Sequence, residues 1–250
     1  SRSRRAGTGR SAARSSSDRF AAAAARPGNG ASAPRTQGVM SVLAPLLLKA
    51  PYDPLKDFAP VATIATTELV LVVHPSVPAT TYQELVAYAR AKPGQLNYAT
   101  PAAGGEQHLV TELFNLATGT QIQHVPYKGA VPAITDLLGG RIQVFIGAVN
   151  SLLPHVKDGK LRLLAGAGGK RFAAFPELPA IAETVPGVAL DVWLGVFMPT
   201  GVPKEILTKV NADIAQVLQS PEVRTSLAAQ GIEPITSTPE ALAQTIRDDH

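Results

Sequence analysis

Segments with the apolar spacing of a strand alternate with segments that have the spacing of a helix, from Thr36 to the end of the chain. Short apolar runs indicate buried strands, and apolar residues three or four positions apart indicate helices. Alternation on this length scale predicts an α/β fold with open, mostly parallel sheets covered by helices on both faces. The predicted strands are 68–75, 96–100, 121–127, 142–148, 161–167 and 190–199; the predicted helices are 80–91 (with Thr80 as candidate N-cap), 106–117, 132–138, 151–158, 179–185, 203–219, 221–230 and 239–248.

The composition is that of a folded protein with a substantial core. Of 250 residues, 45% are hydrophobic and 17% are charged, which suits one large domain or two smaller lobes. No apolar run approaches the roughly 20 residues that a bilayer-spanning helix needs. The sequence contains no cysteine, which excludes disulfides, thiolate nucleophiles and Cys-ligated zinc. Histidine spacing such as H-x-x-x-H is also missing, so no metal and no cofactor are predicted.

The net charge of +4 is distributed unevenly. Residues 1–35 hold eight Arg and one acid, Asp18, which gives this segment +7 and leaves −3 for the other 215 residues. The body therefore offers no broad cationic face, and nucleic acid is not an expected partner. The segment 1–35 is rich in Arg, Ala, Ser and Gly, so we expect a disordered basic tail. A basic arm and a non-native leader are both compatible with it, whereas FAAAAA is too weakly apolar for a signal peptide.

Two strand-to-helix loops have the composition of ligand-binding loops. In α/β sheets, ligands bind beyond the carboxyl ends of strands, where helix N-termini present free N–H groups. The first loop, ATPAAGGEQH (99–108), offers the hydroxyl of Thr100, and its Gly104-Gly105 pair lets a ligand approach the backbone. The following amides suit a carboxylate or a phosphate, although an ordinary flexible turn has the same composition.

The second loop follows the strand that ends in VPYKG. Pro126 fixes the backbone, Gly129 permits a positive φ, and Tyr127 and Lys128 are left at the ligand edge of the sheet. Tyr127 can line a pocket and donate its hydroxyl, and Lys128 adds favourable charge for an anion. The alternatives are that Tyr127 only packs and that Lys128 is only solvated.

No catalytic constellation is evident in the sequence. Only His108 and His124 fall near the two loops, and neither has a carboxylate or nucleophile at a meaningful spacing. A binding module needs no such residues, so it is the leading hypothesis. An enzyme that uses Tyr127, Lys128 or His108 as acid or base is the alternative from another class.

Several longer blocks resemble the Bug-type solute-binding proteins of tripartite tricarboxylate transporters, over about Thr36 to His250. The most specific block is HVPYKGAVPAITDLLGGRIQVF. The resemblance implies a type II periplasmic-binding-protein fold, in which two lobes close on a small carboxylate in the cleft between them. It also implies a periplasmic monomer that delivers its solute to membrane transporter subunits. The other blocks are APYDPLKDFAPVATIA, YATPAAGGEQHL, LPHVKDGKLRLLA, KRFAAFPELPAIAE and WLGVFMPTGVP.

The family's ligand contacts can be transferred position by position. Matching residues come from both loops of the second lobe and from one loop of the first. The implied ligand-binding residues are Thr100, Ala102, Ala103, Gly104, Gly105, Gln107 and His108 in the first loop, Tyr127, Lys128 and Gly129 in the second, and Thr36 and Gln37 in the first lobe.

The chain departs from the family pattern in two places. Residues 1–35 lack the strand and PGG-type loop that open most members, so an incomplete first lobe is expected, and a non-functional remnant is a further alternative. Ile146-Gly147-Ala148 stands where many members carry an acidic residue followed by Asn. The expected lobes are 36–99 plus 195–250 and 100–194, with crossovers near Thr100 and Trp193.

Overall fold

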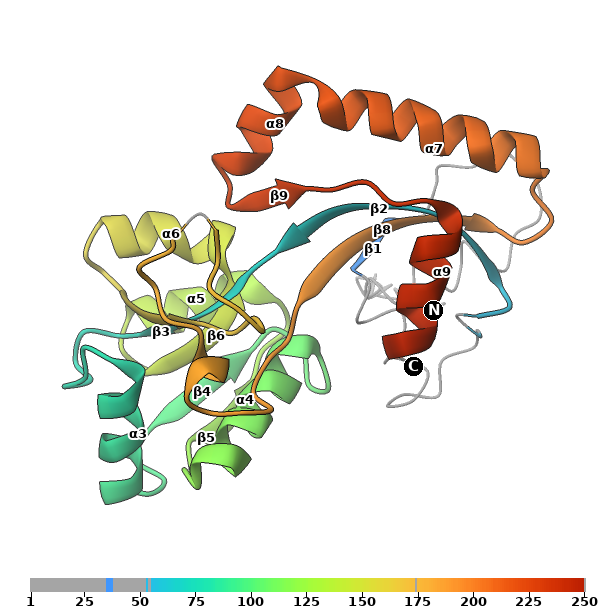
Figure 1. The fold of residues 1–250 in the computed structure, drawn as a ribbon. Helices are drawn as coiled ribbons and strands as arrows, with labels where there is room; N and C mark the ends of the chain where they lie inside the picture. The colour runs from blue at the N-terminus through green and yellow to red at the C-terminus, as the bar shows by residue number, and fades with distance from the viewer. Residues whose placement is uncertain (1–34, 38–52, 54, 174, 250) are drawn as a thin grey trace, which may run out of the picture.

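The computed structural model describes residues 35–37, 53, 55–173 and 175–249, and in these ranges it shows two α/β lobes, each built on one sheet (Figure 1). The predicted disordered tail, residues 1–35, lies outside the described residues except for its last position. Among the described helices, none combines the length and apolarity that a bilayer crossing requires.

The larger sheet has five strands in the order β5-β4-β6-β3-β7. Its strands are β3 (Leu69–Val73), β4 (Asn97–Thr100), β5 (Gln123–Pro126), β6 (Val144–Ala148) and β7 (Arg162–Gly166), and the helices of this lobe are α3 (Tyr82–Ala91), α4 (Glu106–Thr118), α5 (Ala130–Leu138), α6 (Val149–Lys157) and the 3₁₀ turn η1 (Ile181–Glu183). Every residue of β3 is buried, because helices and loops cover both faces of the sheet.

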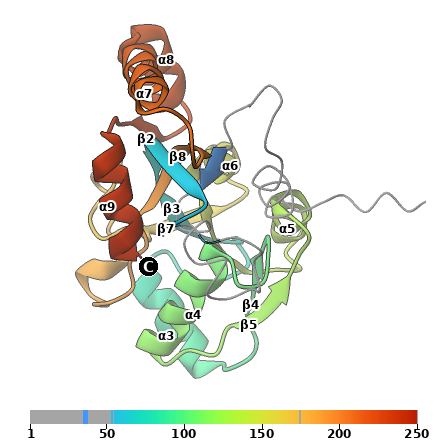
Figure 2. The same ribbon diagram turned by 90° about the vertical axis from the view of Figure 1, so that its right-hand side faces the viewer.

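The smaller sheet has four strands in the order β1-β8-β2-β9. Its strands are β1 (Arg35–Gln37), β2 (Phe58–Thr67), β8 (Val192–Pro199) and β9 (Ile232–Pro234), and the helices of this lobe are α7 (Lys204–Gln219), α8 (Pro221–Ala228) and α9 (Pro239–Asp249). Asn211 holds α7 against β2, because its amide donates to the carbonyls of Val61 and Ser237, both at 2.8 Å. Figure 2 shows α7 and α8 at the opposite end of the molecule from α3 and α4.

The sheets are mixed, and the prediction of mostly parallel strands is wrong in this respect. All strand pairs described in the four-stranded sheet are antiparallel, and in the five-stranded sheet β3 runs against its neighbours β6 and β7. The reason is that β3 comes from β2 of the other sheet and is inserted between β6 and β7 against their direction, which the alternation of strands and helices along the chain does not determine.

The strand pairing also differs from the predicted lobe boundary near Thr100. Both β3 and β4 already pair within the five-stranded sheet, so the chain changes lobe at Glu68, between β2 and β3. The return crossover precedes β8, close to the predicted Trp193. The two crossovers lie side by side, because Thr67 pairs with Val192.

Most predicted helices and strands are present within a few residues of their predicted ends. The helix predicted over 80–91 begins at Tyr82, because Thr81, and not Thr80, is its N-cap. The Thr81 hydroxyl accepts from the amide of Glu84 at 3.2 Å. Thr80 instead donates its own amide and hydroxyl to the Glu84 carboxylate. The segment 179–185 forms only the short turn η1.

Candidate functional site

The first candidate loop connects β4 to α4 and leaves the start of that helix open. Gly104 has φ +75°, a conformation that favours glycine, and Gly105 is an N-cap without a side-chain hydrogen bond. The Gly104 amide donates to Nδ1 of His108 at 2.9 Å, and the Gly105 amide donates to the carbonyl of Ala102 at 3.3 Å. The first amides of α4 have no partner within the helix, so they remain suited to an anion.

The second candidate loop lies beside the first, as predicted from the sequence. β4 and β5 are parallel neighbours, and Thr100 pairs with Pro126 at their carboxyl ends. The Tyr127 amide donates to the Thr100 carbonyl at 2.9 Å, and the Gly129 amide donates to the Pro101 carbonyl at 2.8 Å. Gly129 has φ +112° and is the N-cap of α5, again without a side-chain hydrogen bond. Two helix N-termini therefore open at the same edge of the sheet.

The hydroxyls of Thr100 and Tyr127, which were expected to reach a ligand, are both engaged within the protein. Thr100 is fully buried, and its Oγ1 lies 2.7 Å from Nε2 of His124. The Tyr127 hydroxyl donates to Oδ2 of Asp136 at 2.8 Å. Both side chains therefore hold the loops in place in this structure.

His108 and His124 form the wall behind the first loop. Their rings stack with centroids 4.0 Å apart, and Tyr98 stacks on His124 at 5.0 Å. Burial lowers the pKa of His124, and the neighbouring His108 lowers it further. Nδ1 of His108 accepts from the Gly104 amide, which ties the stack to the first loop.

The remaining predicted site residues fall into two groups. Ala102, Ala103 and Lys128 are exposed at the loop tips, and Gln107 is half-buried. Thr36 and Gln37 lie in β1, where the backbone pairs with β8, and their side chains are outside the described residues.

Glu106 is a residue that the sequence prediction left out. It is the first residue of α4, and it is only 2% exposed. Gln107 donates to its Oε1 at 3.2 Å, and its Oε2 is buried without a hydrogen-bond partner. Burial raises the pKa of this carboxyl to about 6. The spacing of Glu106, Val110 and Phe114 could have revealed its buried position, because all three fall on one face of the helix.

A pair of carboxylates lies at the crossovers between the lobes. Oε1 of Glu68 accepts from the amide of Gly168 at 2.9 Å, and Oδ1 of Asp191 accepts from the amide of Gly169 at 3.2 Å. A Cβ on Gly168 would stand 2.6 Å from one carboxylate and 3.0 Å from the other, so a larger residue would force the Glu68 carboxylate to move. Burial raises the pKa of Glu68 to about 7, and the charge of Asp191 adds to the effect.

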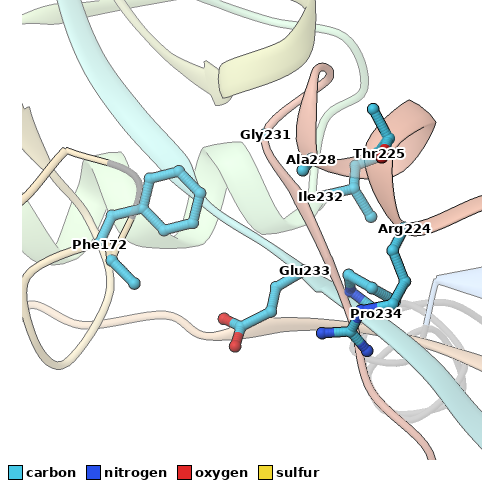
Figure 3. A pocket seen from close by; sticks show the side chains of 9 residues that line it. Phe172, Arg224, Thr225, Ala228, Gly231, Ile232, Glu233 and Pro234 are labelled. Atoms are coloured by element: carbon cyan, nitrogen blue, oxygen red, sulfur yellow. The ribbon is translucent and has the colours of Figure 1, made fainter. Parts of the chain in front are cut away.

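A cavity of about 390 Å³ separates Phe172 from α8 and β9 (Figure 3). None of its lining residues belongs to the two candidate loops. In the part of the chain that the structure describes, no cluster of three or more His, Asp or Glu side chains could hold a metal ion.

The sequence matches one family over most of its length. The model of the family described as "Tripartite tricarboxylate transporter family receptor" matches residues 32–250. Protein BugT of Bordetella pertussis is 37% identical over 205 residues, which cover 82% of this chain and 63% of BugT. The chain therefore spans less than two thirds of the length of such curated relatives.

Solved structures share the fold. The structure of R. palustris Rpa4515 with adipate has a TM-score of 0.87 and 34% identity, covering 93% of this chain and 79% of that one. The structure of periplasmic binding protein BugD has a TM-score of 0.83 and 23% identity, covering 92% and 78%. The prediction of an α/β, periplasmic-binding-protein-like fold is confirmed.

Proposed function

We propose that this chain, which belongs to the tripartite tricarboxylate transporter receptor family, captures a small organic carboxylate in the periplasm and delivers it to membrane transporter subunits. The similarity to Rpa4515, whose structure contains adipate, supports a carboxylate as the ligand class. In this proposal the ligand binds at the carboxyl ends of β4 and β5, and the two lobes close on it as they rotate about the crossovers.

The observation that carries this proposal is the pair of open helix N-termini. α4 and α5 begin at Gly105 and Gly129, and neither helix has a side-chain cap. Backbone amides and the partial positive charge of two helix ends suit a carboxylate without a salt bridge. Lys128 is exposed beside them and adds favourable charge. Thr36 and Gln37 stay in the proposal as contacts from the first lobe.

We propose binding without turnover. General acid–base catalysis needs a titratable group within reach of the substrate, held by a partner that tunes it. In the described part of the two loops, His108 stacks on His124 and accepts from the Gly104 amide, and Tyr127 donates to Asp136. These groups bond to one another rather than converge on an open position. Unchanged ligand after prolonged incubation is the expected result.

Calorimetric titration with acetate, succinate, malate, adipate and citrate tests the proposal, with Ala103→Asp as the site variant. Ala103 is exposed in the first loop, so an aspartate there would compete for the open amides of α4. We expect affinity to fall at least tenfold. The control is Ala212→Asp, an exposed position on α7 in the other lobe, which should leave affinity unchanged. Binding of a neutral or cationic solute, with none of these carboxylates bound, would contradict the proposal.

A further inference from the structure

Glu106 is a buried acid, and no described residue supplies a positive charge to pair with its carboxylate. It lies on the core-facing side of α4, one turn before Val110 and two turns before Phe114. One carboxyl oxygen accepts a long hydrogen bond from Gln107, and the other has no partner although it is fully enclosed. A carboxylate oxygen buried in this way is costly, and such groups are normally paired with a cation or a donor.

Burial and the hydrogen bond from Gln107 set the pKa of Glu106, and no described cation acts on it. On α4, Nδ1 of His108 accepts from the Gly104 amide, and Glu112 accepts from the hydroxyl of Tyr98. On β5, burial lowers the pKa of His124, which favours its neutral form. Lys128 is exposed at the tip of the second loop.

Two opposing effects act on Glu106, and burial is the stronger. The N-terminus of α4 favours the charged form of its first residue, typically by about 0.3–1 kcal/mol. Burial disfavours the charged form more strongly, so the pKa of Glu106 rises to about 6 despite the helix N-terminus. The carboxylate therefore remains charged at neutral pH only at an energetic cost, beside the helix end where a second carboxylate is proposed to bind.

We propose that the site binds a solute carboxylate together with one proton, which is held on Glu106. This inference rests on the proposed function. The proton comes from solvent, no covalent bond changes, and the complex carries one negative charge where two would repel. Protonation also removes the charge from the buried oxygen that has no hydrogen-bond partner.

The proposal predicts proton uptake that depends on pH. With a pKa near 6, Glu106 is mostly ionised at pH 8, so binding should take up about one proton per ligand. At pH 6 about half of the molecules already hold the proton, and uptake should fall to about half a proton. Affinity should weaken about tenfold for each pH unit above 7.

Titration calorimetry in two non-competing buffers at each pH, Mes and Bis-tris at pH 6 and Hepes and Tris at pH 8, measures this uptake, because the two buffers of each pair release protons with different enthalpies. The probes are the same five carboxylates, at pH 6 and pH 8. Glu106→Gln keeps the shape and removes the charge permanently, so it should bind with no uptake and at least tenfold tighter than the unaltered chain at pH 8. The matched control is Glu222→Gln, because Glu222 lies in the first turn of α8 but is exposed. It should retain both the uptake and the affinity.

Different outcomes separate this inference from the proposed function. Carboxylate binding without proton uptake at pH 8 overturns the role of Glu106 and leaves the proposed function intact. Loss of binding in Glu106→Gln at pH 6, with circular dichroism unchanged, would mean that the site needs the charged carboxylate, and this also overturns it. If neither protein binds any of the carboxylates at either pH, both proposals fail.

Discussion

The replacement Glu68→Gln should stabilise the protein above neutral pH. Glu68 lies at a crossover between the lobes, and burial, assisted by the charge of Asp191, moves its pKa from 4.5 to about 7. A change of this size corresponds to about 3 kcal/mol, and partial exposure of the side chain reduces it to about 2 kcal/mol. Glutamine removes the charge, and its carbonyl oxygen can still accept from the amide of Gly168.

The sign of the pH dependence follows from proton binding. Because the folded-state pKa lies above the unfolded one, the folded chain holds more protons between pH 4.5 and 7, and its free energy of unfolding falls as pH rises through this window. The lowered pKa of His124 acts in the opposite direction, but it is common to both proteins and cancels in their difference. The advantage of Glu68→Gln should therefore be small at pH 5 and reach its full size by pH 8.

Urea unfolding at pH 5, 6, 7 and 8 provides the measurement. Trp193 is the only tryptophan in the sequence and is 7% exposed in β8, so its fluorescence reports on the region of the crossovers. Glu177→Gln removes an exposed carboxylate and serves as the control. The reasoning is refuted if Glu68→Gln is less stable than the unaltered chain at pH 8, or if the difference between them does not change with pH.

Three further substitutions test the geometry of the loops and the contact between the lobes. Gly104→Ala should cost about 1 kcal/mol of stability in urea unfolding, because its φ of +75° is strained for alanine while no atom lies within 4 Å of the new Cβ. Gly231→Ala has a similar φ of +68°, but its Cβ would stand 2.7 Å from Cγ1 of Val149 in the other lobe. This substitution should therefore cost about 1–3 kcal/mol more stability than Gly104→Ala. Equal costs would show that Val149 moves aside without an energetic penalty. Tyr127→Phe removes the hydrogen bond to Asp136 and should cost about 1 kcal/mol in the same assay.

The sequence predicted most helices and the strands of the larger sheet because their signals are local, but it did not predict β1 and β2 of the smaller sheet. Runs such as ELVLVV carry the burial pattern of a strand within a few residues. By contrast, β9 (Ile232–Pro234) has no such run and exists through its pairing with β2. The direction of β3 also could not be predicted from the sequence, because it depends on the strands that β3 pairs with in the folded protein.

The candidate loops were predicted from Gly104-Gly105 and from VPYKG because backbone conformation at glycine and proline is likewise local. The predicted reach of the Thr100 and Tyr127 hydroxyls to a ligand remains a prediction. Their present partners, His124 and Asp136, lie 24 and 9 residues away in the sequence. The burial of Glu106 was not predicted, because a charged residue after a Gly-Gly pair is normally exposed to solvent. Glu106 is buried only because of the orientation of α4 against the sheet.

The site and the crossovers belong to one hydrogen-bonded unit. β6 pairs with β4, whose end carries the first loop, and also with β3, which begins directly after Glu68. The amide of Val149, where β6 passes into α6, donates to the carbonyl of Glu68 at 3.0 Å. A rotation between the lobes therefore has to occur at the crossovers, and it must carry both loops as part of a rigid sheet. If the lobes close on a ligand as proposed, they turn at the crossovers where Glu68 and Asp191 accept from the amides of Gly168 and Gly169.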